Sequence, residues 1–112
     1  MVNQTKITPA IRTKVWQLRG YGLTQVAIAK RLSIGQATVS EIVNSPRLWR
    51  NFGTISVYRE NEGGIGQGGA IHRLWEAKIP ARKGYSPYVG QVGVQVPERY
   101  MKRASRILFG SM

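Results

Sequence analysis

The chain has 112 residues, enough for one compact domain or a small head with an appendage, but not for two full domains. It carries 17 lysines and arginines against five acids, all of them glutamates, for a net charge of +12. With no cysteine, no aspartate and one histidine (His72), it lacks the parts of a disulfide scaffold, a cysteine-ligated metal site or a catalytic triad. We therefore expect no enzyme activity, no metal, no cofactor and no small-molecule substrate, and a polyanion as partner.

The first half of the sequence predicts short helices. Thr8 and Thr24 are suitable N-cap residues, and Pro9 suits the first helical position. Apolar residues recur at helical spacing after each cap. The predicted helices cover 8–19, 24–32 and 36–44, with a fourth, short helix that begins at Ser45-Pro46 and ends at Gly53.

The composition changes after Gly53. Alternating apolar residues predict strands over 54–59 and 89–96, and the glycine-rich stretch 62–69 predicts a flexible loop. Its GxGxxG spacing is not followed by the acid of a dinucleotide-binding site, so we interpret it as a hairpin tip. The stretch 71–79 fits a strand or a helix. We favour a strand, paired with 54–59 across the glycine loop.

The chain closes with a turn-rich connection over 80–87 and, from Pro97, a basic helix. The fold class predicted is therefore α+β, with a three- or four-helix unit over 1–53 followed by a β-rich region and a C-terminal helix over 54–112. Basic residues outnumber acids by six to one in 1–44, three to two in 45–70 and eight to two in 71–112. Both ends are basic, and the middle is nearly neutral.

The most informative stretch is 25–44, QVAIAKRLSIGQATVSEIVN. Ala29 supplies a small residue where two helices cross, and Ser33-Ile34-Gly35 supplies a break with one inward apolar residue. A second helix that buries Val39 and Ile42 turns a set of short, polar side chains outward. Such a surface fits the major groove of DNA.

This stretch resembles the helix-turn-helix of lambda-type phage repressors, and 4–44 resembles the N-terminal domain of mariner-type transposases and resolvases. The resemblance implies binding of double-stranded DNA. It assigns base contacts to Gln36, Ala37, Ser40, Glu41 and Asn44. Contacts to the DNA backbone are expected from Gln25, Lys14, Lys30, Arg31, Thr38, Arg47 and Arg50.

Two residues depart from the pattern of these families. Ser33 stands where glycine is usual, which bears on the geometry of the turn. Glu41 stands where many relatives carry a basic or neutral residue. A carboxylate in the groove repels phosphate but can accept a hydrogen bond from a cytosine amine, so Glu41 selects bases rather than adding affinity.

The function predicted is a sequence-specific regulator of a phage or mobile element, cytoplasmic or nucleoid-associated, that binds DNA as a homodimer or higher homo-oligomer. In this interpretation, 54–112 forms a wing or an oligomer interface. Four alternatives remain open: a viral protein that packages the genome inside the virion, the DNA-reading fragment of a transposase or recombinase, an RNA-binding protein, and a helical core without DNA contact. The three tryptophans are expected in the core.

Overall fold

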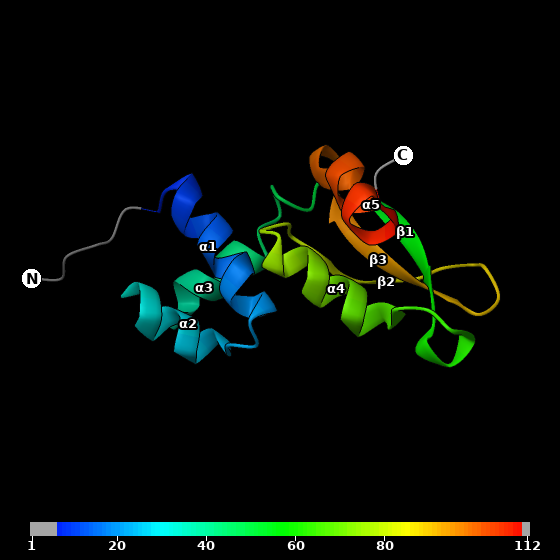
Figure 1. Cartoon of the computed structure of the whole chain (residues 1–112). Helices are drawn as coiled ribbons and strands as arrows, with labels where there is room; N and C mark the ends of the chain where they lie inside the picture. The colour runs from blue at the N-terminus through cyan, green and yellow to red at the C-terminus, as the bar shows by residue number, and fades with distance from the viewer. Residues whose placement is uncertain (1–6, 111–112) are drawn as a thin grey trace, which may run out of the picture.

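A computed structural model describes residues 7–110 and has the predicted α+β fold (Figure 1). Residues 1–6 and 111–112 of the two predicted regions lie outside the described residues. The N-terminal unit, 7–51, contains α1 (Pro9–Gly20), α2 (Gln25–Leu32) and α3 (Gln36–Val43). The C-terminal unit, 52–110, contains β1 (Phe52–Tyr58), η1 (Glu60–Glu62), α4 (Gly66–Glu76), β2 (Arg82–Gly84), β3 (Gln91–Pro97), η2 (Glu98–Tyr100) and α5 (Met101–Phe109).

The first two helices begin at the predicted caps. The Thr8 hydroxyl accepts a hydrogen bond from the Ile11 N–H, and the Thr24 hydroxyl accepts one from the Ala27 N–H, both at 3.2 Å. Each bond satisfies one of the amides that a helix start leaves without a partner. Pro9 occupies the first turn of α1, as predicted.

The N-terminal unit is built around tryptophan. The Trp16 and Trp49 rings meet edge to face, with centroids 6.3 Å apart, and the Trp49 indole N–H donates to the Val43 carbonyl at 2.9 Å. This bond ties the segment after α3 back to the end of that helix. The buried residues of this core are Val15, Trp16, Leu18, Ile28, Ala29, Val39, Ile42, Val43 and Trp49.

The prediction of a fourth helix in this unit is wrong. Ser45-Pro46 begins a single turn, in which the Ser45 carbonyl accepts from the Trp49 N–H at 3.2 Å, and the chain then extends into β1 at Phe52. Gly53, expected to end a helix, lies within that strand. Trp49, at the end of this turn, is buried in the core and 6 % exposed.

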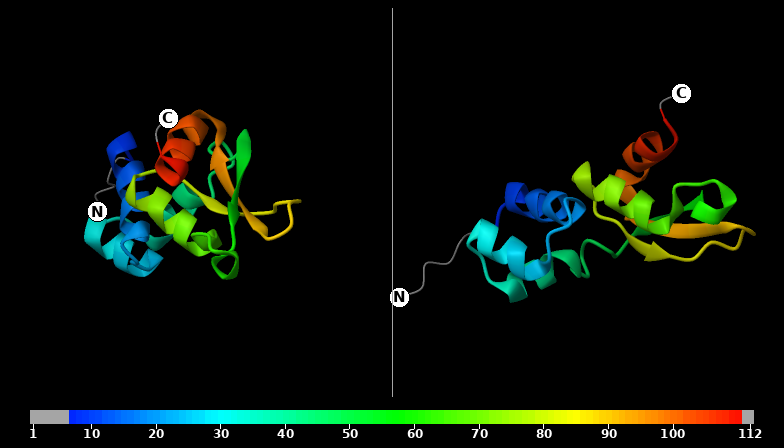
Figure 2. Two further views of the ribbon diagram at one scale, coloured as in Figure 1. Left: turned by 45° about the vertical axis from the view of Figure 1, so that its right-hand side comes forward. Right: turned by 60° about the horizontal axis from the view of Figure 1, so that its bottom comes forward.

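In the C-terminal unit, an antiparallel sheet of order β1-β3-β2 packs one face against α4 and α5 (Figures 1 and 2). The register pairs Ile55 with Val94 and Val57 with Val92. These alternate residues turn toward the helices, as period two requires. The core they form consists of Ile55, Val57, Ala70, Ile71, Leu74, Ile79, Ala81, Val94, Val96 and Ala104.

The predicted strand over 71–79 is also wrong, since α4 covers most of it. The glycine-rich stretch 62–69 is not a hairpin tip, because its second half forms the first turn of α4. β1 pairs instead with β3. Gln67 anchors this helix start, since its side-chain amide donates to the Gly93 carbonyl at 2.9 Å and the Gly84 carbonyl at 3.2 Å. The connection over 80–87 contains the short strand β2, which pattern analysis did not predict.

The two units join where α1 lies against α4. The Trp75 ring is 6.2 Å from Trp16, and Trp75 packs against both cores. Arg19 places its guanidinium over the same Trp75 ring, 4.5 Å from the centroid, and burial lowers its pKa while leaving it charged at neutral pH. A Cβ on Gly20 would come within 2.4 Å of the Glu76 backbone nitrogen, so the helices approach closely. The result is an elongated molecule of 55 × 25 × 25 Å (Figure 2).

Candidate nucleic-acid interface

Helices α2 and α3 are linked by a three-residue turn over 33–35. Ser33 adopts the left-handed conformation (φ 57°, ψ 43°), its N–H donates to the Lys30 carbonyl, and the Ile34 N–H donates to the Ala29 carbonyl. This bond pair is the Schellman motif, whose left-handed residue is usually glycine. Ser33 thus occupies a backbone conformation in which glycine is usual, and the chain turns directly into α3.

The faces of α3 divide as predicted. Val39, Ile42 and Val43 are buried in the core of the N-terminal unit. The predicted base-reading residues Gln36, Ala37, Glu41 and Asn44 are exposed, whereas Ser40 and the predicted backbone contact Thr38 are half-buried. The exposed face of α3 is therefore polar and free of long aliphatic or aromatic side chains.

The N-terminal end of α3 differs from that of α2. Gly35 precedes α3 and offers no side chain to cap its first amides, whereas Thr24 caps α2. Gln36 is the first residue of α3 and Gln25 the first of α2. The N-terminal end of a helix carries partial positive charge and attracts anions such as phosphate.

Basic residues lie at both ends of α3. Lys30 and Arg31 occupy the last turn of α2, just before the turn, and Arg47 and Arg50 follow α3. All four are exposed. Lys14 is exposed on α1, where its ammonium donates to the Gln17 side-chain oxygen at 3.2 Å. Within residues 7–110, no basic side chain forms an ion pair with a glutamate, so these charges are available to an external anion.

Several predicted residues share one depression, of about 520 Å³, beside the second half of α3. Thr38, Ser40, Glu41 and Asn44 line it, and the Asn44 amide donates to the Ser40 hydroxyl at 3.4 Å. Arg12, from α1, lines it as well. The sequence did not identify Arg12 as a site residue. Its position on the polar side of α1 indicated only that its side chain faces outward. Gln36 and Ala37, at the other end of α3, are not part of this depression.

The remaining candidate features are structural. Trp16 and Trp49 are buried, and His72 is exposed with its ring edge-on to Trp75, 5.2 Å between centroids. Across the described part of the chain, no group of three or more His, Cys, Asp or Glu residues could hold a metal ion. None of the described helices has the length and apolar character needed to cross a membrane.

Comparison of the chain with protein-family models, curated proteins and solved structures gives no match.

Proposed function

We propose that the chain binds double-stranded DNA through α3 and acts as a transcriptional regulator of a phage or mobile element. The observation that carries the proposal is the polar exposed face of α3, with unpaired basic residues at both ends of the helix. An α-helix fits the major groove, where base edges carry a distinct pattern of donors and acceptors. Basic residues beside it bind the phosphates and fix the register.

In this arrangement, the α3 face reads the bases. Gln36, at the start of the helix, has an amide that can pair with adenine N6 and N7 together. Ala37 and Ser40 lie against neighbouring base edges, and Asn44 contacts a base at the far end of the helix. Glu41, exposed and without a cation partner, accepts from a cytosine amine and discriminates against other bases.

The DNA backbone is held from both sides of α3. Lys30 and Arg31 reach phosphates on one side, and Arg47 and Arg50 reach them on the other. Lys14, Thr38 and Gln25 add further backbone contacts, Gln25 from the N-terminal end of α2. These contacts supply most of the affinity and little sequence information.

The C-terminal unit, in this proposal, brings two copies together. One recognition helix reads only a few base pairs, so two half-sites about one helical turn apart are needed for a specific operator. The role is one of binding, without catalysis. RNA is the alternative polyanionic ligand. In a competition experiment, duplex DNA should displace bound RNA from the protein.

The experiment is selection of bound fragments from random duplex DNA by the full chain, with the recovered sequences aligned. The proposal expects a motif of two inverted half-sites. Binding without any enriched sequence would replace regulation by genome packaging or architecture. Absence of binding to duplex DNA at low salt would remove the DNA-binding function altogether.

A further inference from the structure

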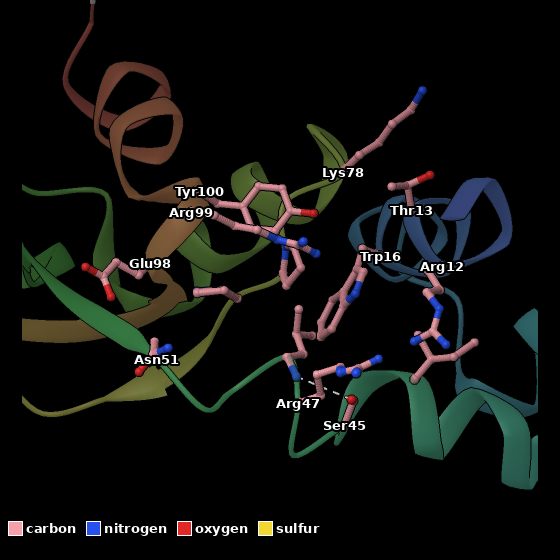
Figure 3. Close-up of a pocket in the computed structure, with 14 residues that line it drawn as sticks. Arg12, Thr13, Trp16, Ser45, Arg47, Asn51, Lys78, Glu98, Arg99 and Tyr100 are labelled. Carbon is pink, nitrogen blue, oxygen red and sulfur yellow. Dashed lines mark hydrogen bonds between the residues drawn. The ribbon is translucent and has the colours of Figure 1, made fainter. Parts of the chain in front are cut away.

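A cleft of about 490 Å³ lies between the two units (Figure 3). Its walls come from α1 and the turn after α3 on one side, and from the α4–β2 connection and the β3–α5 junction on the other. This volume is within the range of small-ligand sites. The cleft adjoins the depression beside α3, with which it shares Arg12 and Ser45, but none of the proposed base-contact residues lines it.

Four basic side chains line this cleft, two from each unit. Arg12 and Arg47 come from the N-terminal unit, and Lys78 and Arg99 come from the C-terminal unit. The single carboxylate of the lining, Glu98, points away from them in Figure 3 and forms no ion pair among the described residues. Four basic side chains on one cleft, none with a carboxylate partner among the described residues, suit a phosphate better than a single carboxylate.

The inner surface of the cleft is apolar and aromatic. Trp16 lies at its centre, 4 % exposed, and Tyr100 directs its hydroxyl toward it (Figure 3). The Arg99 guanidinium lies 5.0 Å from the centroid of the Tyr100 ring. An apolar floor beneath a basic rim favours a ligand with a flat, apolar body and a charged group at one end.

Lys78 provides an independent observation. It adopts the left-handed conformation (φ 67°), its N–H donates to the Trp75 carbonyl at 2.8 Å, and the Ile79 N–H donates to the Leu74 carbonyl at 2.9 Å. This is a second Schellman motif, in a conformation that disfavours every side chain relative to glycine. Lys78 is exposed and makes no side-chain hydrogen bond or ion pair within the described residues. Lys78 therefore carries an ammonium group without an internal partner at the cleft rim, at a position where glycine would be less strained.

We propose that this cleft binds a mononucleotide, with the phosphate at the basic rim and the base against the apolar lining beside Tyr100. Arg47 also belongs to the proposed DNA contacts. A bound nucleotide would therefore occupy Arg47 and remove one contact to a DNA phosphate. By linkage, nucleotide binding then lowers the affinity for duplex DNA. That last effect rests on the proposed function, whereas nucleotide binding itself does not.

The test uses adenosine 5′-monophosphate as the probe and the full chain without DNA, followed by calorimetry and tryptophan emission. We expect saturable binding, with adenosine and inorganic phosphate each binding at least about tenfold more weakly. Arg99→Gln should weaken binding about tenfold, since it removes a charged hydrogen bond. Arg106→Gln is the matched control, because Arg106 is exposed on α5 and does not line the cleft.

Lys78→Gly is the second variant, because glycine relieves the left-handed residue and keeps the fold. It should weaken the nucleotide while raising the melting temperature. Absence of saturable binding, equal loss in Arg99→Gln and Arg106→Gln, or equal affinity for adenosine would each overturn the proposal. If Arg99→Gln and Lys78→Gly weaken duplex DNA as much as the nucleotide, the cleft belongs to the DNA path and the proposal fails. Nucleotide binding without duplex binding would sustain this site and remove the proposed function.

Discussion

The two units of the molecule are both basic, but they present their charge differently. In the N-terminal unit, basic residues border a helix whose outward residues are small or polar and carry no positive charge, and Glu41 is the only acid. In the C-terminal unit, η2 and the basic helix α5 expose long basic side chains from Arg99 to Arg106. Long basic side chains hold phosphates, whereas short polar ones allow a helix to approach base edges. Positive charge alone therefore does not distinguish a surface that contacts DNA bases from one that contacts only phosphates.

The end of the C-terminal unit farthest from α3 differs again. Tyr85 and Tyr88 are 79 % and 62 % exposed in the connection between β2 and β3, and Tyr58 is exposed at the end of β1. Glu60 and Glu62 lie next to this end, and a Cβ on Gly90 would meet the Glu62 side chain at 3.3 Å. Two of the unit's four acids therefore lie near this end, which makes it less suited to DNA than the basic helix α5.

The largest expected effect is on stability, and it tests whether the two cores unfold separately. Trp49→Ala removes a buried ring and its hydrogen bond to Val43, so we expect a loss of about 3–5 kcal/mol in unfolding free energy. Hydrogen exchange should show lost protection in α2 and α3, with β1 and β3 much less affected. Equal loss of protection in both units would show that they unfold as one and would contradict the division into two cores.

The next effect concerns DNA affinity. Five phosphate contacts from Lys14, Lys30, Arg31, Arg47 and Arg50 predict a log–log salt slope of about −4 to −5. Affinity for duplex DNA should therefore fall several hundredfold between about 50 and 200 mM salt. Fluorescence anisotropy over a salt series measures the slope. A flat dependence would exclude nucleic acid as the partner.

A smaller effect tests the junction between the units. Gly20→Ala places a methyl group against the Glu76 backbone, which cannot move aside as a flexible side chain can. We expect a loss of about 1–3 kcal/mol from overpacking, visible in thermal unfolding. Gly22→Ala, at a position with open space, provides a comparison for backbone strain alone, since Gly22 has a positive φ. An unchanged melting temperature for Gly20→Ala would mean that α1 and α4 do not pack this closely.

The smallest effect is a gain. Lys78→Gly should stabilise the fold by about 0.5–1 kcal/mol, because glycine accepts the left-handed conformation at Lys78 without steric cost. Lys83→Gly is the control, since Lys83 lies in the extended strand β2, where glycine weakens pairing. The melting temperatures of both variants, measured by calorimetry, show whether Lys78→Gly stabilises the fold. Destabilisation by both would show that the lysine makes a contact that outweighs its strain.

Much of the N-terminal unit follows from local sequence. Thr8 and Thr24 each make the predicted cap hydrogen bond, and the apolar spacing of α3 gives its buried face. Local propensity failed where tertiary contacts decide the structure. α4 begins among glycines, which disfavour helix, yet the Gln67 bonds to two strand carbonyls and the burial of Leu74 stabilise it.

Some features of the candidate site could also be predicted from local sequence, whereas others depend on tertiary packing. The positions of Gln36 and Glu41 on the exposed face of α3 follow from helical periodicity. Arg12 and the cleft between the units do not, because they depend on α1 packing against α4 and on segments far apart in sequence. A single sequence carries no local signal for such a juxtaposition.

The measurement that tests the reading function of α3 most directly compares Gln36→Ala with Arg47→Ala on the selected site and its single-base variants. Both residues are exposed, so both variants should keep the parent melting temperature. Gln36→Ala should cost about 1–3 kcal/mol on the selected site and relax the choice at one base pair. Arg47→Ala should weaken all duplexes about equally and make the salt slope shallower by about one. Identical behaviour of the two variants across the panel would show that α3 does not read bases.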